Sequence, residues 1–347
     1  MNIKMWIKKR IFLLAIIGLV ISIGAGTLVY VLMRPYFPED MSLTGEKDKP
    51  QETELPEENF PGWRERERAK ALAVVIDNAP EARPQSGLEG AELVYEIPVE
   101  GGLTRFLAMI TEPIDIVGPI RSTRPYINDL AHEYGAFLVH AGGSIKALEN
   151  LEKNKNEHLD EINGSKQVRA AFWRSPDRPK PSNLYSSTEA LLKAAAEEKY
   201  NLTTPSNYLP LVELGEEIDG ELVNDITIFY PNHQAEVRYV YNSEDKVFER
   251  YTAGKPHLTA KGDQITCANI IVQYVHYHYL DGDGRLQLLM HGEGDALIFR
   301  EGKVTTAYWK KFPGEFTSFV DKKGDIIGVL PGPTWVQVVT KATMVDY

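Results

Sequence analysis

The order of hydrophobic and polar positions divides the chain into two regions after residue 62. From 63 to 205, apolar runs typical of strands alternate with helical patterns, as in the strand-like run 71–77. From 225 to 347, strand-like runs follow one another directly and are separated by turn sequences such as NSED and DGDG. The first pattern is typical of mixed α/β domains, and the second of antiparallel sheets, sandwiches or barrels. We therefore expect a mixed α/β domain at 63–205, a linker at 206–224 and a β-rich, mainly antiparallel domain at 225–347.

Turn and capping residues mark the predicted elements of the first domain. The run 91–111 predicts a β-hairpin that turns at Gly101-Gly102. The run 124–135 predicts a helix with Pro125 in its first turn and Gly135 as its terminator.

Two further helices are predicted from their N-terminal residues. The strand-like run 136–141 is followed by two glycines and by Ser144, which we expect to cap a helix. Ser186 and Glu189 have the spacing of a capping box, so a helix should follow them directly.

The N-terminal part of the chain carries the pattern of a membrane anchor. Residues 11–33 form a run of 23 residues without a charge, long enough to cross a bilayer as a helix, and follow a basic tail at 1–10. This order predicts a cytoplasmic tail, a transmembrane signal anchor and an extracytoplasmic remainder. A cleaved signal peptide is the alternative, because small residues at 24–26 could be cut, but the apolar run continues beyond them. The proline-rich, acidic segment 34–62 should be a solvated stalk.

Composition excludes some functions. The formal net charge of -11 is unfavourable for a general nucleic-acid-binding protein, which needs a basic surface. Cys267 is the only cysteine, so the chain can form no intramolecular disulfide and has no N-terminal cysteine to carry a lipid. We expect Cys267 to be a small buried side chain rather than a nucleophile.

Polar residues follow two of the predicted strands where these strands end. Asp77 and Asn78 follow the first strand, and His140 lies at the end of a later one. If the two strands are parallel, these residues lie at the same edge of the sheet, where α/β proteins usually build their sites.

Arginines are the second candidate for chemistry. Arg121 and Arg124 begin a predicted helix, where cations oppose the helix dipole, and Arg105 and Arg83 lie in neighbouring segments. Arginine suits two-point recognition of carboxylate or phosphate groups. The alternative is that these arginines pair with nearby acids and stiffen long loops.

A hydrolytic reading needs paired carboxylates. Asp77, Glu96 and Glu100 could supply such a pair, with Asp77 or Glu100 as acid or base, and His140 is a further catalytic candidate. No HExxH or similar ligand spacing occurs, so we predict no metal and no cofactor.

Several segments together make the chain resemble the YerB-like family of bacterial cell-envelope proteins of unknown function. In the first domain the resemblance is carried by VVIDNAPEARPQSGL, VYEIPVEGGLTRF, GPIRSTRPY, VHAGGS and RPKPSNLY. In the second domain it is carried by ANIIVQY, GEGDALIFREGK and PGPTWVQVV. The resemblance implies a YerB-like N-terminal and C-terminal domain outside the membrane. Members are often described as lipoproteins, but lipidation does not carry over to a chain without an N-terminal cysteine.

The polar residues of these segments are the predicted ligand-binding set. They are Asp77, Asn78, Arg83, Gln85, Glu100, Arg105, Arg121, Ser122, Arg124, His140 and Asn183. The preferred hypothesis is a membrane-anchored extracytoplasmic protein, not an enzyme, that binds an anionic or glycan-like envelope component in this polar pocket. The alternatives are a cell-wall hydrolase or transferase that uses Asp77 and Glu100, and a scaffold in a membrane protein complex with a protein partner.

Overall fold

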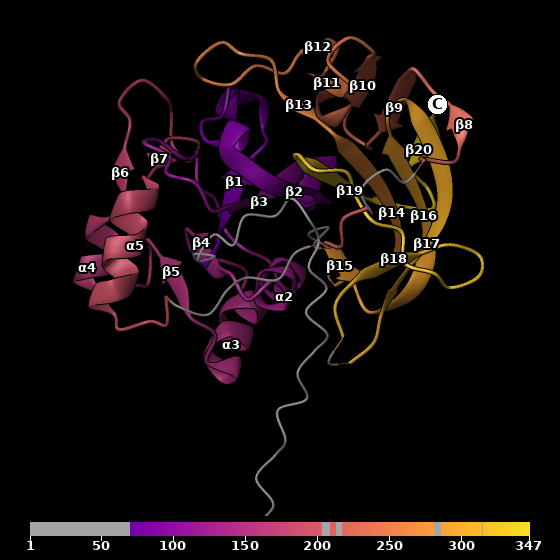
Figure 1. Ribbon diagram of the computed structural model, residues 1–347. Coiled ribbons are helices and arrows are strands. Elements are labelled where there is room, and N and C mark those ends of the chain that lie inside the picture. The colour runs from indigo at the N-terminus through magenta and orange to yellow at the C-terminus, as the bar shows by residue number, and fades with distance from the viewer. Residues whose placement is uncertain (1–69, 203–208, 213–216, 281–285, 314) are drawn as a thin grey trace, which may run out of the picture. The chain divides into compact units, whose positions relative to one another are not determined.

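The computed structural model describes residues 70–202, 209–212, 217–280, 286–313 and 315–347 (Figure 1). The predicted membrane segment 11–33 and stalk 34–62 lie outside these residues. Within the described ranges, no helix has the length and apolar character needed to cross a membrane.

A twelve-stranded sheet runs through both sequence regions (Figure 1). Ten of the twelve strands lie side by side in one continuous order. They are β18 (Ser318–Val320), β17 (Lys303–Lys311), β16 (Gly292–Arg300), β14 (Asn269–Tyr279), β19 (Thr334–Thr340), β2 (Ala91–Pro98), β3 (Thr104–Ile110), β1 (Leu72–Asp77), β4 (Phe137–His140) and β5 (His158–Asp160). Two short strands extend it, with β15 (Leu286–Leu289) beside β14 and β8 (Glu221–Leu222) beside β17. The two sequence regions are joined through β19, which pairs in parallel with both β14 and β2.

The centre of this sheet is largely parallel. Strand β1 is parallel to β4, and β4 is parallel to β5. Because β3 is antiparallel to both β1 and β2, these two strands also run in one direction. The carboxyl ends of β1, β2 and β4 therefore lie at the same edge of the sheet. The strands that end at Asp77 and His140 are thus parallel, as the prediction of a shared edge requires. Every residue of β1 is buried, as expected for a strand covered on both faces.

A six-stranded antiparallel sheet is formed by the second sequence region. Its strands are β12 (Lys255–Pro256), β11 (Val247–Thr252), β10 (Val237–Asn242), β9 (Asp225–Phe229) and β20 (Met344–Asp346), with β13 (Thr266–Cys267) beside β11. The second region is thus strand-rich and mainly antiparallel, as its sequence pattern predicts.

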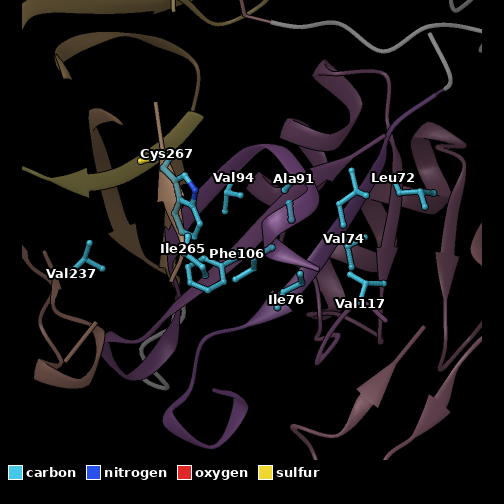
Figure 2. Close-up of a cluster of buried hydrophobic side chains, with 14 of the residues drawn as sticks. Leu72, Val74, Ile76, Ala91, Val94, Phe106, Val117, Val237, Ile265 and Cys267 are labelled. Carbon is cyan, nitrogen blue, oxygen red and sulfur yellow. The ribbon is translucent and has the colours of Figure 1, made fainter. Parts of the chain in front are cut away.

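The two faces of the large sheet pack into two cores. One core joins Val94 and Phe106 to residues of the second region such as Val237 and Cys267 (Figure 2). The other places Leu107 of β3 with residues of the helix that follows Arg124. Since side chains alternate along a strand, the neighbours Phe106 and Leu107 point to opposite faces.

Four α-helices are described, all in the first region. They are α2 (Pro125–Glu133), α3 (Ile145–Asn154), α4 (Lys166–Ala170) and α5 (Thr188–Glu197). Four 3-10 turns, η2 (Pro80–Ala82), η3 (Leu88–Gly90), η4 (Glu100–Gly102) and η5 (His233–Ala235), and a small hairpin of β6 (Trp173–Arg174) and β7 (Leu184–Tyr185) complete the elements.

The capping residues are mostly as predicted. Ser144 caps α3 by accepting a hydrogen bond from Ala147 N. The prediction for α5 was wrong by one residue, because its cap is Ser187, which accepts from Ala190 N. Ser186 lies one residue before the cap, and its buried hydroxyl donates to the carbonyl of Ala171.

Candidate functional site

The carboxyl edge of the sheet is occupied by the segment 117–123, which lies between the ends of β1 and β4. Asp77 N donates to Pro119 O at 2.8 Å, and Arg121 N donates to Val75 O at 2.9 Å. On the other side, Ala141 N donates to Arg121 O at 3.1 Å. These backbone bonds place Arg121 beside the carboxylate that ends β1.

Asp77 is the anionic centre of this edge. Its Oδ2 lies 3.0 Å from Nε of Arg121 and accepts a hydrogen bond from Ser182 Oγ at 2.8 Å. Arg105 is the cross-strand neighbour of Asp77, and its Nη1 donates to Ser122 O at 2.6 Å. The carboxylate, two arginines and the loop backbone thus form one cluster.

Glu100 and Arg124 form the second ion pair of the edge. Nε and Nη2 of Arg124 donate to the two carboxylate oxygens of Glu100 at 2.7 and 2.6 Å. Burial by itself would raise the pKa of Glu100, but the hydrogen bonds and charge of Arg124 outweigh it and lower that pKa. Glu100 is therefore an ionised partner of Arg124, whereas a general acid needs a raised pKa.

Positive charge is in excess here. We call Asp77, Glu100, Arg105, Arg121 and Arg124 the arginine edge, which has three cations and two carboxylates. Arg105 is only 7% exposed, and its burial, followed by the charges of Arg124 and Arg121, lowers its pKa to about 10. Crowding three guanidinium groups in this way is unfavourable for folding and favourable for holding an anion.

A second polar cluster lies on the opposite face of the sheet, because Asn78 follows Asp77 in the chain and points the other way. Asn78 Nδ2 donates to Glu96 Oε1 at 3.0 Å and to Thr104 Oγ1 at 2.8 Å. Thr104 Oγ1 also donates to Glu96 Oε1 at 2.7 Å. Gln85 joins through its Nε2, which donates to Asn78 Oδ1 at 3.2 Å.

The second sequence region completes this cluster with Arg250. Arg250 is fully buried, its Nη2 donates to Glu96 Oε2 at 2.6 Å, and its guanidinium lies 4.6 Å from the ring centre of Trp335. Arg250 Nη1 also contacts Nδ1 of His257. Because arginine only donates, this Nδ1 accepts, so the proton lies on Nε2 and is donated to Gln85 Oε1 at 2.8 Å. Burial and the charge of Arg250 lower the pKa of His257 well below its ordinary value, so this imidazole is neutral.

We call this set the junction network, because its members connect the two sequence regions. They are Asn78, Gln85, Glu96, Thr104, Arg250 and His257. All are buried and hydrogen-bonded to one another, so the network is a structural link rather than an open site.

The structure thus divides the predicted set. Asp77, Glu100, Arg105, Arg121, Ser122 and Arg124 come together at the arginine edge. Asn78 and Gln85 belong to the junction network, and Arg83 borders that network through Asn78 Oδ1, to which its Nε donates at 3.1 Å.

His140 and Asn183 lie apart from both clusters. His140 Nδ1 donates to Gly142 O at 2.8 Å, and its Nε2 lies 2.9 Å from His158 Nδ1. Asn183 Oδ1 accepts from Arg174 at 3.0 Å. Within the described residues, the side chains of His140 and Asn183 make no hydrogen bond or ion pair with Asp77 or Arg121, so both lie outside the arginine edge.

The sequence interpretation missed Thr104, Arg250 and His257, and it considered Glu96 only as a catalytic carboxylate or as a partner of the loop arginines. A signal was present for Arg250, since Phe248, Arg250 and Thr252 are the inward positions of an alternating strand, where a charge is unusual. Glu96 likewise interrupts a run of apolar residues in β2.

Two remaining candidates from the sequence are a reactive thiol and a metal site. Cys267 is buried, and burial raises the pKa of its thiol, which is unfavourable for a nucleophile. Across the described ranges, no group of three or more His, Cys, Asp or Glu side chains is arranged to hold a metal ion.

Comparison with known proteins identifies the family. Residues 61–201 match the model described as protein of unknown function (DUF3048) N-terminal domain, and residues 226–336 match the corresponding C-terminal domain. The chain is 31% identical to the Bacillus subtilis (strain 168) protein named "Putative lipoprotein YerB", over 78% of this chain and 81% of that protein. It is also similar to the crystal structure of the YerB protein from Bacillus subtilis, with a TM-score of 0.73, 28% identity and coverage of 82% of this chain and 97% of that chain. The chain therefore belongs to the YerB-like family, with the DUF3048 N-terminal and C-terminal domains in order.

Proposed function

We propose that the chain is a membrane-anchored extracytoplasmic protein that binds an anionic component of the cell envelope at the arginine edge. The anchor is supported by the 23 uncharged residues at 11–33, which follow a basic tail. The extracytoplasmic position is further supported by the relative from Bacillus subtilis, whose name describes it as a lipoprotein.

The observation that carries the binding proposal is the state of Arg121. Its Nε is buried and lies 3.0 Å from Asp77 Oδ2, but the geometry is not that of a hydrogen bond. Among the described residues this N–H has no hydrogen-bond partner, although its side chain is still 26% exposed. The Nε itself is buried, so an anion would meet the exposed part of this guanidinium, which is crowded by Arg105 and suited to receive the oxygens of a carboxylate or phosphate.

The hydrolase or transferase alternative has less support. It requires Asp77 or Glu100 to hold a proton near neutral pH, and Arg124 lowers the pKa of Glu100. Asp77 is occupied by Arg121 and Ser182. We therefore favour binding without turnover, and a scaffold role would be distinguished by a partner that binds regardless of these arginines.

Co-sedimentation with purified cell-wall sacculi tests the proposal. The full chain in neutral detergent should bind sacculi that keep their covalently attached anionic polymers, and should bind acid-stripped sacculi much less. Arg121→Gln should weaken binding about tenfold, because charge-assisted hydrogen bonds are lost. Binding should also fall as salt is raised.

Arg238→Gln is the matched control, since Arg238 of β10 forms an exposed ion pair with Asp225 of β9 and has no part in the arginine edge. Circular dichroism should show that both variants are folded. Equal binding to stripped and unstripped sacculi, or equal binding by Arg121→Gln and wild type, would contradict the proposal.

A further inference from the structure

A second feature of the fold is a cavity of about 650 Å³ between the two family domains. One wall is the η2 loop of the N-terminal domain, including Arg83 and Pro84. The other walls are the segments 233–236 and 252–258 of the C-terminal domain. Its volume lies within the range of sites for small organic molecules, roughly 300 to 1,000 Å³.

Arg83 is the residue that gives this cavity a polar anchor. Its Nη2 donates to Asn78 O at 2.8 Å and to Gln234 O at 2.7 Å, and its Nε donates to Asn78 Oδ1. All three acceptors are neutral, and no carboxylate of the described chain lies within ion-pair distance of Arg83. Burial, followed by the charge of Arg250, lowers the pKa of Arg83 to about 10, so it remains a cation at neutral pH.

The wall of the cavity also contains an unused hydroxyl. Thr252 is 6% exposed, and its Oγ1 is buried without a hydrogen-bond partner within the described residues. A buried hydroxyl without a partner is unusual in native proteins, and here it lies in the wall of a cavity that also contains a cation without a carboxylate.

The lining also includes carbon surface, and the loop that carries Arg83 is held in place. Pro84, Pro256 and Leu258 contribute carbon surface, and Leu258 is 41% exposed. Arg178 Nη2 donates to Pro84 O at 2.6 Å, which fixes the loop that carries Arg83. Lys255 and Glu236 add opposite charges to the lining and offset each other.

We infer that this cavity is a second binding site, for a small organic molecule with a flat apolar body and one carboxylate or phosphate group. The anionic group pairs with Arg83, and the body lies against the prolines and Leu258. Because the walls come from both domains, the ligand bridges them. This site is on the opposite face of the sheet from the arginine edge and does not depend on the function proposed for that edge.

Ligand-observed ¹⁹F NMR with the full chain in neutral detergent tests this inference, with empty micelles as the blank. The probes are 4-fluorobenzoate, 4-fluorophenyl phosphate and the neutral 4-fluorobenzamide. At least one of the two anions should bind about tenfold more tightly than the amide, because only an anion pairs with Arg83. Whichever anion binds more tightly identifies the preferred head group.

Two variants and a control separate binding from folding. Arg83→Gln should remove the preference for anions over the amide. Lys255→Glu, a charge reversal at an exposed position of the lining, should weaken both anions without disturbing the core. Arg238→Gln should bind the probes as the wild type does.

The inference is overturned if the amide binds as tightly as both anions, or if folded Arg83→Gln keeps the anion preference. If Arg83→Gln does not fold, Lys255→Glu decides, and unchanged anion affinity in that variant overturns the inference.

Discussion

At the scale of single residues, the direction of each side chain decides its role. Asp77 and Asn78 are neighbours in the sequence, yet Asp77 belongs to the arginine edge and Asn78 to the junction network. The physical reason is the alternation of side chains along an extended chain. A polar pair at the end of a buried strand therefore supplies one side chain to each face.

Arg250 is the residue on which we expect stability to depend most. Replacing it with methionine leaves the Glu96 carboxylate buried without its cation and should lower the free energy of unfolding by about 3 to 5 kcal/mol. Urea denaturation of the two proteins measures the difference.

An exposed ion pair provides the comparison. Arg238→Met removes a pair whose side chains are 48% and 44% exposed, and should lower the free energy of unfolding by less than about 1 kcal/mol.

A double variant tests the cause of the loss in Arg250→Met. Adding Glu96→Gln to Arg250→Met should restore part of the lost free energy of unfolding, because the unpaired buried carboxylate is then uncharged. Equal losses in Arg250→Met and Arg238→Met would show that the buried pair has no special importance.

At the scale of elements, the paired ends of β4 and β5 hold an uncharged histidine. His140 is fully buried, and its Nδ1 donates to Gly142 O, so its Nε2 accepts a hydrogen bond from His158. Burial is the main cause that lowers the pKa of His140 to about 4, and it also lowers the pKa of His158. Protonation of His140 therefore costs more free energy in the folded chain than in the unfolded chain.

This arrangement predicts a loss of stability in mild acid. The unfolded chain binds protons at histidine near pH 6.5, whereas folded His140 does so only near pH 4. The contribution of neutral His140 to the free energy of unfolding is therefore fully present above about pH 6.5. It falls as the pH drops toward 4, by up to about 1.4 kcal/mol per pH unit.

Urea denaturation between pH 7 and pH 5 measures the slope. His140→Asn keeps a donor for Gly142 O but cannot be protonated, so its slope should be smaller than that of the wild type. Some slope should persist, because burial also lowers the pKa of His257. An unchanged slope in His140→Asn would argue against this account.

At the scale of the whole described fold, the two family domains share one sheet. Strand β19 of the second region lies between β14 and β2, so the boundary between the sequence domains falls inside the sheet. Phe106 of β3 packs at 5.4 Å against Trp335 of β19, and Glu96 pairs with Arg250. Neither sequence domain has a core of its own on this side of the sheet.

We therefore expect residues 70–347 to unfold in a single cooperative transition. Calorimetry should give one peak whose calorimetric and van't Hoff enthalpies agree. The segment 63–205 expressed alone should lack a stable fold, because β2 becomes an open edge and the face that carries Phe106 is uncovered. Two separate calorimetric peaks, or a folded 63–205 segment by near-ultraviolet circular dichroism, would contradict this expectation.

Most of the local structure follows from short-range patterns in the amino-acid sequence. These patterns predicted the hairpin of β2 and β3, the helix with Pro125 in its first turn, the cap at Ser144 and the strand-rich second region, because each depends on propensities and periodicity within a few residues. The sequence also indicated the arginines of the arginine edge as candidate binding residues, since they lie in short polar segments near the ends of strands.

Which polar residues meet depends on long-range strand pairing and not on any local pattern. Glu96 and Arg250 are 154 positions apart, and Gln85 and His257 are 172 positions apart, so no local pattern links them. The pairing of β19 with β2 brings these pairs together, and it depends on burying apolar side chains from both sequence regions in one core. Burial then makes unpaired charges costly, which selects the ion pairs and hydrogen bonds that the fold contains.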